Sequence, residues 1–254
     1  MSVVAFVAGA QTGTRYPGSS TDIPEIGTER DALRHLVQDR CLLNWTQRHL
    51  PEPCVRVVLP DSGAAISGYA VVADRMGAGH YLLVPTRTMA GTDSAELVSP
   101  EAPNYFAAAW HARDLVSGYV GHPVPRTELG LAVNTVRTRG QDQFHIHIEC
   151  LQSGVIESLR AAAEQVAADS LTLVRVGGGT YSGVRIMGVE LDGTNPYDLL
   201  ARLMPEIHRR MGDYTVIIAG MQFRDGPGFL ALTGLGPDGD LLLDGTCAVA
   251  GAIG

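Results

Sequence analysis

The chain has 254 residues, 45% of them hydrophobic and 18% charged, which fits a globular protein of one or two domains and excludes a disordered or fibrous chain. Its formal net charge is -8, because 19 basic residues stand against 27 acidic ones, and no basic run occurs. Proteins bind nucleic acid mainly through clustered Lys and Arg, so we expect no nucleic acid among the partners.

The N-terminal half is predicted to begin with an arm and a helix, followed by strands. Residues 1–27 are rich in Gly, Pro, Ser and Thr and have no sustained apolar period, which predicts an extended arm. Apolar positions at helical spacing predict a helix over 28–43, with Thr28 as its cap. Short β-branched and aromatic runs predict three strands, the last two joined as an antiparallel hairpin. These strands are 55–59, 69–73 and 80–84.

The rest of the chain is predicted to alternate helices and strands. Ser99-Pro100-Glu101 is a helix-start signal, and apolar residues on one face extend this helix to about residue 120. Later apolar periods predict helices over 155–168 and 196–211. The remaining strands are predicted at 129–134, 143–150, 171–176, 184–191, 214–219 and 228–233.

The last predicted hairpin resembles the first in sequence. Residues 213–217 and 228–232 repeat the pattern of 68–72 and 79–83, in which Gly or Asp precedes an aromatic or apolar run. Because two amphipathic strands often look alike, an internal duplication remains open at this point.

Four cysteines fit none of the close-spaced zinc patterns, and two interpretations of them remain open. They are either free buried thiols or members of one or two disulfides. In the second case Cys41–Cys54 is the favoured pair, because a short Pro-containing segment separates the two residues. The cysteines are Cys41, Cys54, Cys150 and Cys247.

The location of the protein is predicted from the absence of apolar runs. No run approaches the roughly 20 residues that a membrane-spanning helix needs, so we expect no transmembrane anchor. The opening stretch 3–10 lacks a preceding basic region, which argues against a signal peptide and predicts a cytoplasmic protein. Ala8-Gly9-Ala10 would fit a cleavage site, so an extracytoplasmic location stays the alternative. The oligomeric state is not determined by the sequence.

The segment 141–150 carries most of the candidate chemistry. Side chains alternate between the two faces of a strand, so every second residue here shares one polar face while the apolar residues between them pack into a core. The polar face would carry Gln141, Gln143, His145, His147 and Glu149.

Three interpretations of this face remain open. It is a solvated surface, although so many hydrogen-bonding side chains argue against that. It is a metal site, because His-x-His places two imidazoles near one ion, but further ligands are needed and a distant Asp or Glu would have to serve. It is a site of phosphoryl chemistry, in which a neutral imidazole attacks phosphorus. The other histidines show no partner spacing: His35, His49, His80, His111, His122 and His208.

We favour phosphoryl chemistry, because donors for phosphate oxygens lie close in sequence. The spacing of Asn134, Gln141, His145 and His147 resembles the Asn, Gln and paired His of the histidine-triad (HIT) superfamily. That resemblance makes His147 the nucleophile. Glu149 stands where many members carry a third histidine and the galactose-1-phosphate uridylyltransferase branch carries a glutamine.

Within this superfamily the chain resembles the CDP-diacylglycerol pyrophosphatases. The resemblance covers roughly residues 41–150. The chain departs from the family pattern at two positions. It has Thr88 where the family usually carries an Arg, with Arg87 one residue earlier, and it has Asp142 where the family usually carries an Asn. Cys41, Cys54 and Cys247 also resemble cysteines of the family. The motifs that carry the resemblance are 81–86, 91–94, 103–106 with Trp110 and Arg113, and 141–150.

The resemblance implies an α+β fold, with a HIT-like antiparallel sheet and packed helices. It divides the chain into an arm (1–27), a HIT-like catalytic half (28–152) and a second half (153–254) that is HIT-like or degenerate. We expect the active strand to lie centrally in the sheet. Trp110 and Phe106 are expected in the core.

The implied reaction is hydrolysis of the pyrophosphate bond in a CDP-diacylglycerol-like substrate, releasing a nucleoside monophosphate. His147 would attack, His145 would orient or donate to the phosphate, and no metal or other cofactor is required. One alternative is a hydrolase or nucleotidyltransferase that acts on a soluble dinucleotide, NAD-like or nucleotide-sugar substrate. The others are a metal-dependent enzyme or binder that uses the His-x-His pair, and a catalytically silent nucleotide-binding relative. Asn134, Gln141, Gln143, Arg139 and Glu149 are the candidate phosphate or imidazole contacts, with a solvated loop charge as the alternative for Arg139.

Overall fold

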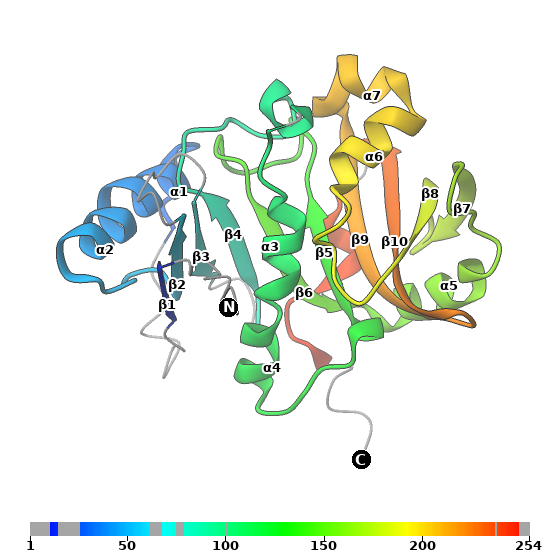
Figure 1. Cartoon of the computed structure of the whole chain (residues 1–254), viewed down its shortest axis with the longest axis horizontal. Helices are drawn as coiled ribbons and strands as arrows, with labels where there is room; N and C mark the ends of the chain where they lie inside the picture. Colours follow the sequence, from blue (N-terminus) through cyan, green and yellow to red (C-terminus); the bar gives the residue numbers. More distant parts are fainter. Residues whose placement is uncertain are drawn as a thin grey trace, which may run out of the picture.

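The computed structural model describes residues 11–14, 26–60, 68–74, 79–99, 101–236 and 238–248. Most of the arm predicted over 1–27, and the Gly-rich segment of the first hairpin, lie outside the described residues. Within them the chain forms an α+β fold around one long antiparallel sheet, as predicted (Figure 1). No helix among the described residues is both long enough and apolar enough to span a bilayer.

The strands of the described chain pair in the order β1-β2-β3-β4-β6-β5-β9-β10-β8-β7, and β11 pairs with the end of β6. Strand β6 therefore lies in the interior of the sheet, between β4 and β5. The strands are β1 (Gln11–Thr14), β2 (Arg56–Leu59), β3 (Tyr69–Ala73), β4 (Tyr81–Pro85), β5 (Leu129–Val133), β6 (Ile146–Leu151), β7 (Thr172–Val176), β8 (Gly179–Met187), β9 (Tyr214–Phe223), β10 (Gly226–Leu235) and β11 (Leu243–Asp244).

The predicted strands are confirmed in kind, with shifted ends. Strand β6 begins at Ile146, so the first residues of the predicted strand 143–150 lie in the loop before it. The strand predicted at 184–191 begins earlier, at Gly179, because a turn through Gly177 and Gly178 at positive φ joins it to β7 as a hairpin.

The helices show where local chemistry ends a periodic pattern. The helix predicted over 101–120 is two helices. Asn104 caps the first by accepting a hydrogen bond from the N–H of Ala107. At the end of this first helix, the guanidinium of Arg113 donates to the carbonyl of Trp110. The helix predicted over 196–211 is broken at Met204, because Pro205 follows it. The helices are α1 (Ala32–His35), continued by a π-helical turn (Leu36–Cys41) and α2 (Leu42–Arg48), then α3 (Tyr105–His111), α4 (Asp114–Val120), α5 (Ser153–Ala163), α6 (Pro196–Leu203) and α7 (Pro205–Arg210).

The helices cover the sheet unequally. On one face, α3, α4 and α6 pack against β4, β5, β6 and β9 in the largest hydrophobic cluster, in which Phe106 and Trp110 are buried as predicted (Figure 1). The other face has two separate clusters. The helices from α1 to α2 pack on β2, β3 and β4, and α5 packs on β7, β9 and β10. The central strands lie between these two clusters.

The second half repeats the strand order of the first. Read towards the centre of the sheet, the four strands β3-β4-β6-β5 inside β1 and β2 have the same connections as β7-β8-β10-β9, and β5 pairs with β9 where the halves meet. The hairpin β3–β4 thus occupies the position of β7–β8. The sequence similarity had instead related the hairpin β3–β4 to the hairpin β9–β10. The strand order does not support that pairing of hairpins.

All four cysteines form disulfides, so the interpretation as free thiols is wrong. The favoured pair Cys41–Cys54 is present and joins the π-helical turn before α2 to the segment before β2. A second disulfide, Cys150–Cys247, ties β6 to the C-terminal segment.

Candidate active site

Strand β6 places His147 at the boundary between two hydrophobic clusters. His147 lies opposite Leu82 of β4 and Ala132 of β5, and residues directly opposite on neighbouring strands share a face. Leu82 belongs to the cluster under the α1–α2 helices, and Ala132 belongs to the cluster under α5. The polar face of β6 is therefore the part of the sheet that neither the α1–α2 helices nor α5 covers.

His80 joins this site although sequence reasoning found no partner for it. Its ring is buried, and its Nε2 lies 2.9 Å from Oε1 of Glu149 and 3.0 Å from Nδ1 of His147. Tyr81 pairs with Ile148, so extending the register by one residue sets His80 opposite Glu149. The pairing of β4 with β6 was the missing signal, because the sequence predicts both strands but not that they are neighbours.

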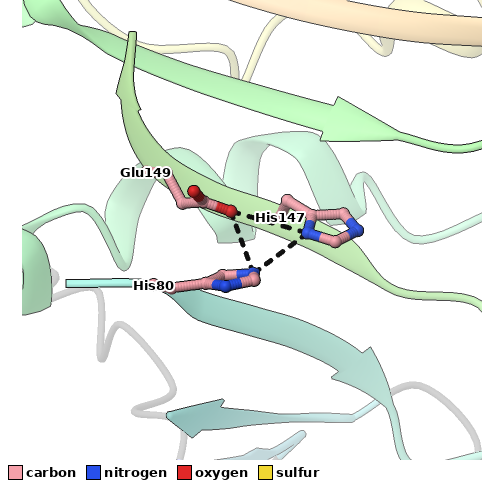
Figure 2. A group of neighbouring side chains, drawn as sticks. All are labelled: His80, His147 and Glu149. Carbon is pink, nitrogen blue, oxygen red and sulfur yellow. Dashed lines mark hydrogen bonds and ion pairs between the residues drawn. The ribbon is translucent and has the colours of Figure 1, made fainter. Parts of the chain in front are cut away.

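The three side chains form a closed cluster (Figure 2). Oε1 of Glu149 also lies 3.6 Å from Nδ1 of His147, and the rings of His80 and His147 stack with their centroids 5.2 Å apart. Nδ1 of His147 is therefore occupied by this cluster. Its Nε2 is buried and has no hydrogen-bond partner among the described residues.

Ion pairing governs the charges of the cluster. Burial acts to raise the pKa of Glu149, but its contacts with His147 and His80 outweigh burial and hold that pKa at about 2. Burial acts to lower the pKa of His80, but the hydrogen bond to Glu149 and the carboxylate charge raise that pKa above its ordinary value. Glu149 is thus an anion at neutral pH.

His145 is held in one neutral tautomer. Its Nδ1 lies 2.7 Å from the carbonyl oxygen of Gln143, and a carbonyl can only accept, so Nδ1 carries the proton. Burial, assisted by the nearby His147, lowers the pKa of His145 to about 3. Its Nε2 is consequently an acceptor at neutral pH. Of the two roles expected of His145, orienting the phosphate or donating to it, this tautomer is compatible with the first and leaves Nε2 without a proton for the second.

A cavity of about 420 Å³ lies against this cluster. Such a volume is typical of small-molecule sites. The cavity brings together the histidine pair, the loop after β5 and the segment before β11. Its lining residues are Ile26, Gly27, Asp74, Leu82, Asn134, Thr138, Gly140, Gln141, His145, His147 and Asp240.

Three amide side chains predicted as phosphate or imidazole contacts have different positions. Asn134 lines the cavity, and its Oδ1 accepts from the N–H groups of Gly239 and Asp240, which leaves its Nδ2 without a partner among the described residues. Gln141 also lines the cavity, but its amide bonds the N–H of Leu33 and the carbonyl of Gly27.

Gln143 is instead bonded away from the cavity. Its Nε2 donates to the carbonyls of Pro85 and Arg87, and its Oε1 accepts from the N–H of Met89. The side chain of Gln143 thus holds the segment after β4. Its contact with an imidazole runs through its backbone carbonyl, which bonds His145.

Replacing Gln143 with alanine is expected to lower the free energy of unfolding by about 1–3 kcal/mol, because buried backbone groups lose their partners. Urea denaturation measures this loss. The matched control is Gln165→Ala, since Gln165 is exposed at the end of α5 and should change stability by less than about 0.5 kcal/mol. Equal losses in the two variants would contradict the role of the Gln143 amide.

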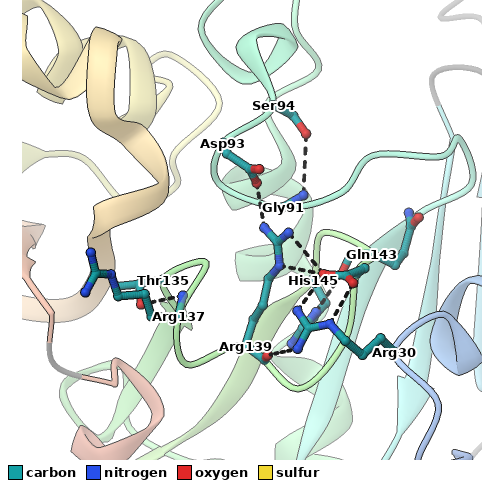
Figure 3. A network of polar contacts seen from close by, with 10 residues as sticks. Arg30, Gly91, Asp93, Ser94, Thr135, Arg137, Arg139, Gln143 and His145 are labelled. Atoms are coloured by element: carbon teal, nitrogen blue, oxygen red, sulfur yellow. Dashed lines mark hydrogen bonds and ion pairs between the residues drawn. The ribbon is translucent and has the colours of Figure 1, made fainter.

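Arg139 lies in an ion network beside the cavity (Figure 3). Its guanidinium bonds Asp93 at 2.5 Å and Asp142 at 3.1 Å, and Asp142 also bonds Arg30 at 2.6 Å. A Cβ on Gly91 would overlap the Arg139 guanidinium, so the network needs glycine there. Arg139 is not among the described residues that line the cavity. Its positive charge is already paired with Asp93 and Asp142.

The hydrogen bond from Arg30 lowers the pKa of Asp142 from 3.8 to about 2, assisted by Arg139. Because the folded-state pKa lies below the unfolded value, this stabilisation is complete above about pH 4 and disappears as the pH falls through about 2. We expect Asp142→Asn to melt below the wild type at pH 6 and the gap to narrow towards pH 2. Thermal unfolding over this range checks the trend, and a gap independent of pH would contradict it.

His145 and His147 line a cavity at the central strand β6, and a buried carboxylate lies beside His147. This arrangement suits a hydrolase that works on phosphate esters or anhydrides. The sequence model of the CDP-diacylglycerol pyrophosphatase family matches residues 28–250. The chain belongs to this family, which confirms the predicted resemblance, and it is a phosphoric-anhydride hydrolase. The match reaches well into the second half, whereas the motifs recognised in the sequence end near residue 150.

Proposed function

We propose that this chain hydrolyses the pyrophosphate bond of CDP-diacylglycerol through a covalent nucleotidyl intermediate on Nε2 of His147. One observation carries the proposal: Nε2 is buried without a partner beside the cavity, while Nδ1 is occupied by His80 and Glu149. A buried nitrogen left unpaired is costly unless a ligand or a reaction uses it.

The cluster supports the attack electrostatically. In the reactive tautomer Nδ1 of His147 carries the proton and Nε2 carries the lone pair. The lone pair forms the N–P bond to the cytidylyl phosphorus, the anhydride P–O bond breaks, and phosphatidate leaves with the electron pair. The ring then carries a positive charge, and the adjacent carboxylate of Glu149 stabilises it.

Water completes the reaction. Its oxygen bonds to phosphorus, the N–P bond breaks, the electron pair returns to Nε2, one proton passes to solvent, and CMP is released. The acceptor Nε2 of His145 is suited to bind this water. Asn134 Nδ2 and the backbone around Gly140 are suited to bind phosphate oxygens, whereas Gln143 and Arg139 act through the positions of neighbouring groups.

The repeated strand order supports a duplicated HIT-like fold, in which the second half has lost the chemistry. Strand β10 occupies the place of β6 and carries no histidine. Leu230 and Leu232 of β10 pack in the cluster under α5. The halves 28–152 and 153–254 would then be the two copies. The cavity lies against the first half and the segment before β11.

The disulfides favour an oxidising compartment. All four cysteines are paired, and disulfides persist mainly outside the cytoplasm. We therefore favour the extracytoplasmic alternative over the cytoplasmic prediction.

Hydrolysis assays in ¹⁸O-labelled water test the function. With CDP-diacylglycerol in detergent micelles we expect CMP and phosphatidate, with the label in CMP, because water cleaves the nucleotidyl intermediate. Acid-free quenching and mass spectrometry should locate a base-stable phosphoramidate on His147. CDP-choline, NAD and a nucleotide sugar serve as soluble comparison substrates. Label in phosphatidate would contradict attack at the cytidylyl phosphorus, and faster turnover of a soluble compound would contradict the lipid substrate.

A further inference from the structure

The three side chains that fix His147 also have the composition and spacing of a metal site. Nε2 of His80, Nδ1 of His147 and Oε1 of Glu149 lie 3.0, 2.9 and 3.6 Å apart in the three pairs (Figure 2). In a tetrahedral zinc site with bonds of about 2.0–2.1 Å, ligand atoms lie roughly 3.3 Å apart. An ion would thus reach all three atoms with little movement of the side chains.

The surroundings favour a divalent ion there. The three side chains are at least nine-tenths buried, which shields an ion from water, and imidazole with carboxylate is a common zinc ligand set. Asp74 and Asp240 line the adjacent cavity, so further negative charge faces the site. His145, the other member of the His-x-His pair, is not among the three described residues whose ligand atoms lie close enough together to share one ion.

Metal binding and nucleophilic attack require opposite tautomers of His147. A neutral imidazole has one N–H and one lone pair. An ion on Nδ1 takes the lone pair there, so the proton moves to Nε2. That nitrogen then has no lone pair to form a bond to phosphorus.

We propose that His80, His147 and Glu149 form an inhibitory site for a zinc-type divalent ion, which holds His147 in its non-nucleophilic tautomer. The inhibition rests on the proposed function of His147, whereas the binding does not.

Binding is tested by titrating the metal-free protein with Zn²⁺ in a calorimeter and with Co²⁺ in the visible range. We expect one equivalent of each and the absorption of a tetrahedral Co²⁺ site. His80→Ala should weaken binding about 100-fold or more, and Glu149→Gln should also weaken it. Thermal unfolding checks that each variant is folded. If His80→Ala does not fold, the affinity of Glu149→Gln decides whether the site exists.

The matched control is His35→Ala. His35 bonds Asp39 and Asp31 at the surface, at 2.6 and 3.2 Å, and so imitates the ligand set in an exposed setting. This variant should keep the wild-type affinity. The absence of saturable binding, or equal affinities in His80→Ala, Glu149→Gln and the wild type, would overturn the site.

Activity separates this inference from the proposed function. We expect hydrolysis to fall in proportion to Zn²⁺ occupancy and to return on chelation. Activation by stoichiometric Zn²⁺ would overturn the inhibitory role and the metal-free nucleophile together. A protein that turns over no pyrophosphate in either state, yet shows the Co²⁺ spectrum and its loss in His80→Ala, would contradict the proposed function and support the metal site.

Discussion

Replacing His147 with alanine is expected to lower kcat/KM for pyrophosphate hydrolysis by at least about 10³-fold, because removal of a covalent nucleophile leaves only binding and electrostatic stabilisation. The imidazole is almost fully buried, and its Nδ1 contacts Glu149 and His80, so alanine removes both the nitrogen that faces the cavity and the ring that the carboxylate stabilises. Steady-state kinetics with CDP-diacylglycerol measures the loss.

A rescue experiment and a control variant make this prediction specific. His147→Gly leaves space for a small molecule, and added imidazole should restore part of the turnover if the ring itself is the nucleophile. The matched control is His111→Ala, since His111 is half-exposed and bonds Asp192 at the surface. A His147→Ala variant that folds and retains more than about a tenth of the wild-type rate would refute the nucleophile.

Removing the disulfide Cys150–Cys247 by alanine substitution of both residues is expected to lower the free energy of unfolding by about 4–5 kcal/mol. The cross-link joins residues 97 apart in sequence, and a longer closed loop restrains the unfolded chain more strongly. Removing Cys41–Cys54, with a separation of 13, should cost about 3 kcal/mol. Guanidinium denaturation of the two double variants compares the losses.

The larger disulfide also secures the segment that borders the cavity. Between Gly239 and Cys247 the chain passes Asn134, which accepts two of its N–H groups, and then pairs with β6 as β11. Asp240 in this segment lines the cavity. We therefore expect the Cys150/Cys247 variant also to lose activity and to be cleaved faster by protease near residue 240. Equal stability losses in both double variants would contradict the loop-length argument.

The sequence alone predicted much of the local structure, because periodicity and turn residues act over short distances. The alternation of Phe144, Ile146 and Ile148 with polar residues correctly indicated a strand buried on one face by a core. The helix ends were less accurate, since caps such as Asn104 and the break before Pro205 override the apolar period.

The chemistry of the family was also readable from the sequence. The motifs around His145 and His147 indicated a CDP-diacylglycerol pyrophosphatase, and the family match confirms it. The sequence could not decide which of the polar residues reach the cavity. Gln143 and Arg139 carry suitable groups, but backbone carbonyls and acidic side chains occupy them.

By itself, then, the sequence determined the family, most of the secondary structure and the strand that carries His147, because each depends on neighbouring residues. Tertiary structure decided the composition of the site. Residues 80 and 149 are far apart in the chain, and the pairing of β4 with β6 sets His80 opposite Glu149. Strand pairing across such a separation depends on the packing of the whole sheet, so the contact between His80 and Glu149 has no local signal.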